Sequence, residues 1–192
     1  MAEFALIACV GFFVVVSILL VLFYIVSIFN GLISLKNNID KSWANIDVVL
    51  KQRSDLIPNL VETVKGYAKY EKGVLEDLTK LRTAMMSATG PSEKARANDA
   101  LSASLKSIFA VAENYPKLQA NENFLKLQEQ LTAMENQIAD RREFYNDSVV
   151  LYNTRIASIP DSFAASMLGM QPKEYFKATE DEKKLVEVKI EN

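Results

Sequence analysis

The chain has 192 residues, carries a net charge of −2 from 22 basic and 24 acidic side chains, and contains no histidine. This balance excludes the bulk electrostatic attraction with which many proteins bind nucleic acid. Without histidine the chain lacks the usual acid–base group at neutral pH and the commonest metal ligand. The one cysteine, Cys9, lies in an apolar run, so no intramolecular disulfide can form. These features argue against an enzyme and favour a structural or binding role.

The first predicted element is a membrane-spanning helix at about 4–29. This run is apolar or aromatic except for three small residues, and roughly 20 residues suffice to cross a hydrocarbon core. A cleaved signal peptide would have a basic start and a shorter apolar core, whereas this chain begins with Glu3 as its first charged side chain. We therefore expect an uncleaved anchor over residues 1–36. The predicted membrane-spanning residues include Phe4, Phe12, Leu19 and Phe29.

Positive charge follows the predicted span and does not precede it. Lys36, Lys41, Lys51 and Arg53 come after the span, and only the α-amino group offsets Glu3 before it. Cytoplasmic flanks of membrane helices carry an excess of lysine and arginine. The pattern predicts that the N-terminus lies outside and that the bulk of the chain lies in the cytoplasm.

Residues 39–85 are predicted to form one long helix. Apolar or aromatic side chains recur along it at alternating spacings of three and four, which keeps them on one helical stripe. At about 1.5 Å per residue this helix would be about 70 Å long, so other helices must cover it. The core and register positions predicted for it include Trp43, Arg53, Pro58, Tyr67 and Glu71.

Three of these positions depart from the pattern expected of an apolar helical stripe. Pro58 lacks the N–H that would bond the carbonyl of Ser54, but the stripe continues in phase on both sides, so we expect a single kinked helix. Arg53 and Glu71 are expected to snorkel or to pair with polar groups on neighbouring helices and so to set the register. A catalytic role would need a convergent pocket, which no sequence motif supplies.

A second long helix is predicted to begin at Pro91. The stretch Ala88-Thr89-Gly90-Pro91 breaks the preceding pattern, and proline suits the first turn of a new helix. Glu93 stands where the positive end of the helix dipole favours an acid. The helix is expected to end near Glu113.

A third long helix is predicted from about Asn121, a suitable N-cap, to Ser158. Its apolar stripe contains Tyr145 and one charged residue, Arg141. We expect Arg141 to pair with an acid such as Glu71 on the first long helix.

A short helix with Phe163 and Leu168, ended by Gly169, is predicted to follow, and then a turn with Tyr175 and Phe176. We expect these apolar clusters to cover one end of the bundle. The alternative is contact with the membrane surface, for which an interfacial helix usually carries more neighbouring basic residues than this segment does.

The C-terminal tail, 179–192, has a different pattern. Apolar and charged residues alternate from Leu185 to Ile190, which is typical of a strand. No other segment reads as a strand, so the tail is either loosely packed or disordered, or it pairs with an edge in a neighbouring subunit. The residues expected to make such an oligomer contact are Val186, Val188 and Ile190.

Several stretches, in order, carry the signature of a known family. They include Trp43-Ala44-Asn45-Ile46-Asp47, the run from Asp55 to Tyr67, the run from Glu113 to Asn121, and then Glu135-Asn136, Arg141, Tyr145-Asn146, Tyr152-Asn153 and Tyr175-Phe176. These stretches resemble the LemA family of bacterial membrane proteins. The usual motif Leu-Lys-Arg-Arg-Tyr-Asp differs here at Gln52 and Ser54, which concerns one basic and one aromatic surface contact.

The resemblance implies a membrane-anchored helical bundle with no assigned catalytic residues. Some relatives are linked to membrane remodelling, including a magnetosome-forming branch, or are encoded near a membrane protease. The expected location is therefore the bacterial inner membrane.

Together, the patterns and the resemblance predict an all-α protein. The transmembrane helix is followed, over 37–178, by an antiparallel bundle of three long helices and a short C-terminal helix. The expected function is a membrane-anchored scaffold that self-associates and organises the inner membrane. The alternative is an adaptor that recruits another membrane protein, such as a protease or an envelope-stress component. The expected partners are the lipid bilayer and further copies of the chain, with no nucleic acid and no cofactor.

Overall fold

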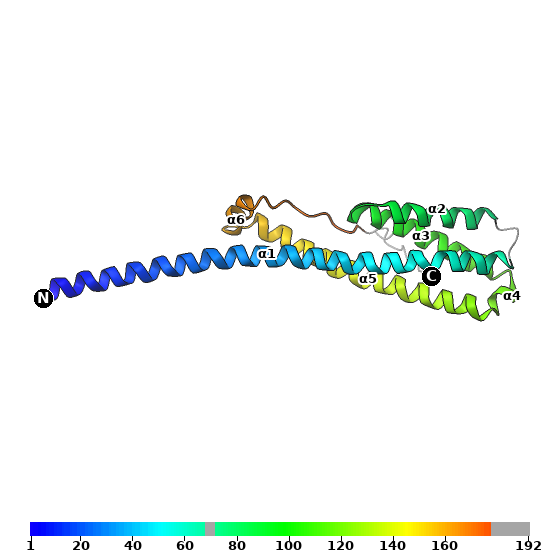
Figure 1. Cartoon of the computed structure of the whole chain (residues 1–192), viewed down its shortest axis with the longest axis horizontal. Coiled ribbons are helices and arrows are strands. Elements are labelled where there is room, and N and C mark those ends of the chain that lie inside the picture. The colour runs from blue at the N-terminus through cyan, green and yellow to red at the C-terminus, as the bar shows by residue number, and fades with distance from the viewer. Residues whose placement is uncertain (68–71, 178–192) are drawn as a thin grey trace, which may run out of the picture. The chain divides into compact units, whose positions relative to one another are not determined.

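A computed structural model gives the chain an all-α fold, as predicted (Figure 1). The structure describes residues 1–67 and 72–177, and for residues 2–10 it describes the backbone alone. The helices are α1 (Ala2–Lys65), α2 (Lys72–Ser87), α3 (Pro91–Ala112), α4 (Pro116–Gln119), α5 (Glu122–Ala157) and α6 (Asp161–Met167). The predicted tail strand lies outside the described residues.

The predicted single helix over 39–85 is wrong in its second half. α1 continues through Pro58 but ends at Lys65, and a separate helix, α2, begins at Lys72. Leu75 of α2 packs in the same core as Val61 of α1, so α2 runs back antiparallel to α1. The apolar stripe stays in phase across the turn because both arms of this helical hairpin face one core. Periodicity alone therefore could not distinguish the hairpin from a longer helix.

The chain divides into two compact units, and α1 and α5 each contribute to both. The first unit holds Met1–Asp40 and Ser148–Lys173. The second holds Lys41–Asp147 and Glu174–Asn192, of which 68–71 and 178–192 lie outside the described residues.

The second unit is a helical bundle with one continuous apolar core. α1, α2, α3, α4 and α5 all contribute buried side chains to it. These residues are Ile57, Leu60, Val61, Val64, Leu75, Leu78, Leu101, Leu105, Ile108, Ala112, Leu118, Phe124, Leu127 and Leu131. The rings of Phe109 and Phe124 meet edge to face at 6.1 Å between centroids, a geometry that aromatic pairs favour.

The boundaries of α3 and α5 agree closely with the prediction. Pro91 opens α3. The side-chain oxygen of Asn121 accepts a hydrogen bond of 2.9 Å from the backbone N–H of Phe124, so Asn121 caps α5 as predicted. The acid expected in the first turn of α3, Glu93, accepts bonds from the backbone N–H and the hydroxyl of Thr89 at 2.8 and 3.2 Å. These bonds hold the pKa of Glu93 below its ordinary value.

The first unit contains the apolar N-terminal part of α1 and the short helix α6. Among the described residues, α1 is the one helix long and apolar enough to cross a membrane. Ala164 and Ala165 of α6 pack on Ile28 and Leu32 of α1. Gly169 has a φ of +62° just after α6, a conformation that glycine adopts without strain, and it ends the helix as predicted.

Candidate functional site

The predicted membrane-spanning residues lie on an apolar surface of α1. Phe12 and Leu19 are exposed, as are most large apolar side chains between Phe12 and Val26. Phe29 is half-buried, because the cluster around α6 covers it. Phe4 lies in α1 among the residues whose side chains are not described. A surface of this kind suits hydrocarbon and not water.

A buried polar cluster around Arg53 joins three helices of the bundle. The Arg53 side chain comes from α1, is only 3% exposed, and donates to Asn98 Oδ1 at 2.7 Å and to Ser102 Oγ at 3.0 Å, both on α3. It also forms an ion pair of 2.6 Å with Glu135 of α5. Ser102 in turn donates to the carboxylate of Glu135 at 3.1 Å. The side chains of α1, α3 and α5 are thereby fixed in one register.

The electrostatics of this cluster fit a structural role. Burial lowers the pKa of Arg53, and the neighbouring charge and hydrogen bond of Glu135 oppose that effect. Arg53 Nε has no hydrogen-bond partner among the described residues. Glu135 is 43% exposed, so water shares the solvation of the pair. For a partly buried pair of this kind, the free-energy cost of removing the charges from water offsets much of their attraction, so the pair contributes little net stability.

Pro58 is accommodated by a contact between α1 and α2. Because proline has no N–H, the carbonyl of Ser54 loses its helical donor. Arg82 of α2 replaces that donor: its Nε lies 2.9 Å from the Ser54 carbonyl oxygen. The irregularity in α1 thus becomes an attachment point for α2.

An aromatic cluster surrounds Trp43. Its ring lies 5.7 Å from that of Tyr145 and 6.2 Å from that of Phe176, measured between centroids. Lys94 of α3 stands over the indole at 5.8 Å and also forms an ion pair with Asp47. A cation over an indole face is an attractive contact. The segment after α6, residues 170–177, is called the C-terminal segment. α1, α3, α5 and this segment therefore meet at Trp43.

Two Tyr-Asn pairs of α5 hold the C-terminal segment by its backbone, and we call each pair a clasp. In the second unit, Asn146 exchanges two bonds of 2.9 Å with the backbone N–H and carbonyl of Phe176, and the Tyr145 hydroxyl donates to the carbonyl of Glu174 at 2.8 Å. The amide of Asn146 therefore pairs with the segment as a neighbouring β-strand would.

The first unit repeats the same clasp. Asn153 exchanges bonds of 2.9 and 3.0 Å with the backbone of Lys173, and the Tyr152 hydroxyl donates to the carbonyl of Gln171 at 3.2 Å. Burial, and then the negative charge of Asp40, raise the pKa of Tyr152. The tyrosine therefore keeps its proton and remains a donor.

The other predicted positions lie elsewhere. Tyr67 is exposed just after α1, and its hydroxyl accepts a bond of 3.0 Å from Asn121. Arg141 donates to the backbone carbonyl of Asn45 at 3.1 Å. Glu71, its expected partner, lies outside the described residues, as do the tail residues expected to contact a second subunit.

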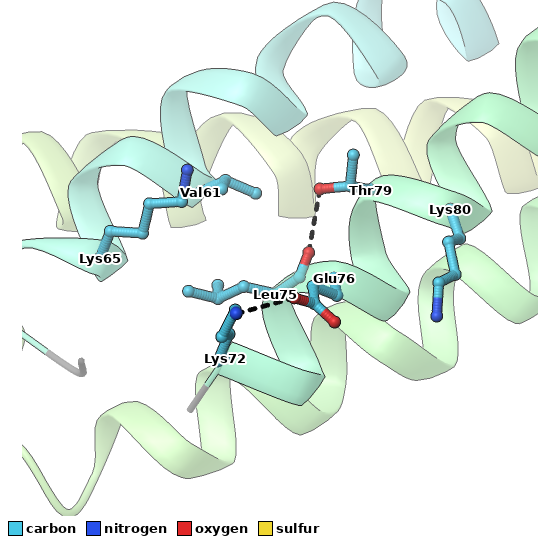
Figure 2. A pocket seen from close by; sticks show the side chains of 7 residues that line it. All are labelled: Val61, Lys65, Lys72, Leu75, Glu76, Thr79 and Lys80. Carbon is cyan, nitrogen blue, oxygen red and sulfur yellow. Dashed lines mark hydrogen bonds and ion pairs between the residues drawn. The ribbon is translucent and has the colours of Figure 1, made fainter. Parts of the chain in front are cut away.

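A groove of about 460 Å³ lies beside the end of α1. Figure 2 shows the side chains that line it. Val61 and Leu75 supply apolar surface, and Lys72 pairs with Glu76 at 3.7 Å. Because the lysines of this groove have acidic partners, it does not concentrate positive charge. In the part of the chain that the structure describes, no three acidic or thiol side chains converge as metal ligands would.

Comparison with protein families decides the identity of the chain. Residues 42–190 match the LemA family. This chain belongs to the LemA family. The matched range contains the Arg53 cluster, the bond from Arg82 to the Ser54 carbonyl, the Trp43 cluster and both clasps. All of these features lie in the part of the chain that matches the family.

Three proteins are similar to this chain over most of its length. This LemA protein is 25% identical to Magnetosome protein MamQ 2 of Paramagnetospirillum magneticum, over 84% of this chain and 70% of that protein. It is 23% identical to Magnetosome protein MamQ of Magnetospirillum gryphiswaldense, over 77% of this chain and 64% of that protein. It is also 25% identical to Protein LemA of Metamycoplasma hominis, over 90% of this chain and 80% of that protein. We conclude that the chain is a membrane-anchored helical LemA protein.

The sequence interpretation assigned no role to several residues that make these contacts. Asn98 and Ser102 are ordinary polar residues of α3, and Arg82 lies outside the apolar stripe, so no local pattern marks them. The two asparagines of the clasps do carry a signal, because Tyr-Asn recurs after seven residues. A period of seven places both pairs on one face of a helix.

Proposed function

We propose that this LemA protein is a membrane-anchored scaffold whose copies associate and thereby organise the bacterial inner membrane, with the bundle in the cytoplasm. One observation carries the proposal: the apolar span and the first helix of the bundle are the same helix, α1, which has no break between Ala2 and Lys65. Association of bundles would therefore act on the membrane-spanning segments without an intervening flexible linker.

Features of the bundle surface support association between copies. Large apolar side chains, including Val48, Met86 and Leu125, remain exposed outside the apolar span. Covering such side chains in a second copy would remove apolar area from water, which is the main driving force of protein association. The positive residues that follow the span support the cytoplasmic placement.

The relatives support a role at membranes. Two of the similar proteins are named magnetosome proteins, and the family resemblance includes members linked to membrane remodelling. A scaffold of this class needs no catalytic residue, which agrees with a chain whose polar clusters join helices to one another.

The test is the mass of the full-length protein in mild detergent and in lipid nanodiscs, measured by light scattering. We expect a discrete oligomer that Leu125→Glu dissociates, because a charge would be buried at the contact. Thr132→Glu, at an exposed polar position of the same helix, is the matched control and should leave the mass unchanged.

Two further outcomes are informative. A monomer in both media would refute self-association and would favour the alternative, an adaptor that recruits another membrane protein. If the tail pairs between subunits, deleting residues 184–192 should reduce the oligomer size, and an unchanged size would refute that interpretation.

A further inference from the structure

The helix α6 has an unusual distribution of side chains. Its buried residues are the small Ala164 and Ala165, which pack on α1, and Asp161, which pairs with Arg155. Its outer face carries Phe163 and Met167, which are 69% and 79% exposed, and Ile159 just before the helix is 81% exposed. A surface helix of a globular protein normally turns its large apolar residues inward. Here the large apolar residues point outward and stay uncovered by the rest of the first unit.

The position of α6 identifies that partner. Its alanines contact Ile28 and Leu32 of α1, immediately after the exposed apolar surface that ends at Val26. Figure 1 shows α6 beside α1 at this point. The apolar run of α1 covers about 26 residues, or about 39 Å, whereas the hydrocarbon core is about 30 Å thick. The end of the run at Phe29, next to Ile28, therefore lies near the boundary between hydrocarbon and headgroups.

We propose that α6 is an interfacial helix that inserts Ile159, Phe163 and Met167 into the leaflet in which α1 ends. The occupant of this apolar face is lipid, because the face lies at the depth of that boundary and is continuous with the lipid-facing surface of α1. This inference does not depend on self-association.

The polar groups of the first unit fit the same depth. A groove of about 490 Å³ beside α6 is lined by apolar residues, among them Ile33 and Leu168, and by Lys36 of α1. A basic side chain near the end of the apolar run suits the phosphate groups of lipids. Asp161, at the start of α6, is paired with Arg155 at 2.6 Å, so the one acid of the helix carries its own counter-ion.

A helix of seven residues would bind a membrane weakly if it were free. α6 does not need an affinity of its own, because α1 already holds it at the bilayer and makes the contact intramolecular. A short apolar face is therefore sufficient.

The experiment measures the depth of α6 in lipid nanodiscs with the full-length protein. Cys9 is replaced by alanine, and a nitroxide label is placed on a single cysteine introduced at position 163 or 167. A third label, at position 151, is the matched control. Leu151 is also an exposed apolar residue, at 54%, but its contacts place it further from the apolar run than α6. Its neighbour Asn153 is bonded to Lys173, and Lys173 pairs with Asp40 of α1 at 3.7 Å. Asp40 lies about 18 Å along α1 beyond Ile28.

We expect labels at 163 and 167 to collide more often with oxygen, which concentrates in the bilayer, than with a water-soluble nickel chelate, and the label at 151 to show the reverse. Preference for the nickel chelate at all three positions would overturn the proposal. Shielding from both reagents, with dipolar broadening that disappears on dilution with unlabelled protein, would identify a second copy as the occupant and would also overturn it. Circular dichroism of each labelled protein checks that the helices are retained.

Discussion

The bond between Arg82 and the carbonyl of Ser54 explains how α1 tolerates Pro58, and it can be tested by removing each partner in turn. We consider Arg82→Met, which keeps most of the apolar stem but removes the donor, in the parent chain and in a Pro58→Ala background. In that background the new alanine has an N–H that can bond the Ser54 carbonyl within α1. The donor on α2 then becomes dispensable.

The magnitude follows from burial. Ser54 is 0% exposed, so water cannot replace a lost donor at its carbonyl. A buried carbonyl left without a partner costs about 1–3 kcal/mol, and a bond from a charged donor contributes about 1.5–3 kcal/mol. We expect Arg82→Met to lower the free energy of unfolding by about 2 kcal/mol in the parent chain and by less than about 0.5 kcal/mol in the Pro58→Ala background. The coupling energy is then about 1.5 kcal/mol.

Trp43 makes the assay specific to the bundle. It is the one tryptophan of the sequence, and in the structure it packs on Tyr145 and Phe176. Urea unfolding in mild detergent, followed by its fluorescence, gives the free energy of each variant. Lys80→Met on the same helix, at an exposed lysine, is the control and should cost little in either background. Equal effects of Arg82→Met in both backgrounds, or no effect in the parent, would refute the reasoning.

Three further predictions concern other contacts. Arg53→Met should lower the free energy of unfolding by about 2 kcal/mol in the same urea assay, because Asn98 is left buried without its donor. Adding Asn98→Leu should recover about 1 kcal/mol of that loss. A double variant no more stable than the single one would contradict this. Asn146→Ala should speed hydrogen exchange at the Phe176 amide by about tenfold, the equivalent of about 1.4 kcal/mol, while unchanged exchange there would show that the clasp is not needed. For Glu93 the pKa in the folded state lies below the ordinary value of 4.5. Its contribution to stability is therefore present above pH 4.5 and is lost as the pH falls through the lowered pKa. The difference in urea midpoint between the parent and Glu93→Gln should therefore be largest at neutral pH and vanish in acid; a difference that persists in acid would assign it to packing.

The helix boundaries that could be predicted are those with local chemical causes. Pro91 fixes the start of α3 because it lacks a donor that the first turn does not need. Asn121 fixes the start of α5 because its side chain satisfies a free backbone N–H. The apolar span of α1 follows from composition alone. In each case the residues that decide the structure are close together in the sequence.

The parts that could not be predicted depend on contacts between distant residues. The turn after Lys65 interrupts a stripe that remains in phase, so the choice between one helix and a hairpin depends on whether α2 can return to the core. The partners of Arg53 lie 45 and 82 residues further along the chain, at Asn98 and Glu135, and both are ordinary polar residues. Spacing along one helix carries no information about which polar side chain on another helix will face it.

The repeated Tyr-Asn pairs lie between these two cases. Their period of seven is visible in the sequence and places them on one face of α5, but it does not reveal what they bind. Asparagine is a poor helix former because its amide competes for backbone groups, so two asparagines at equivalent positions within one helix need a compensating contact. The structure supplies that contact, since each amide pairs with a backbone N–H and carbonyl of the C-terminal segment. An unfavourable residue repeated at helical spacing is therefore a usable sign that an extended segment lies along the helix.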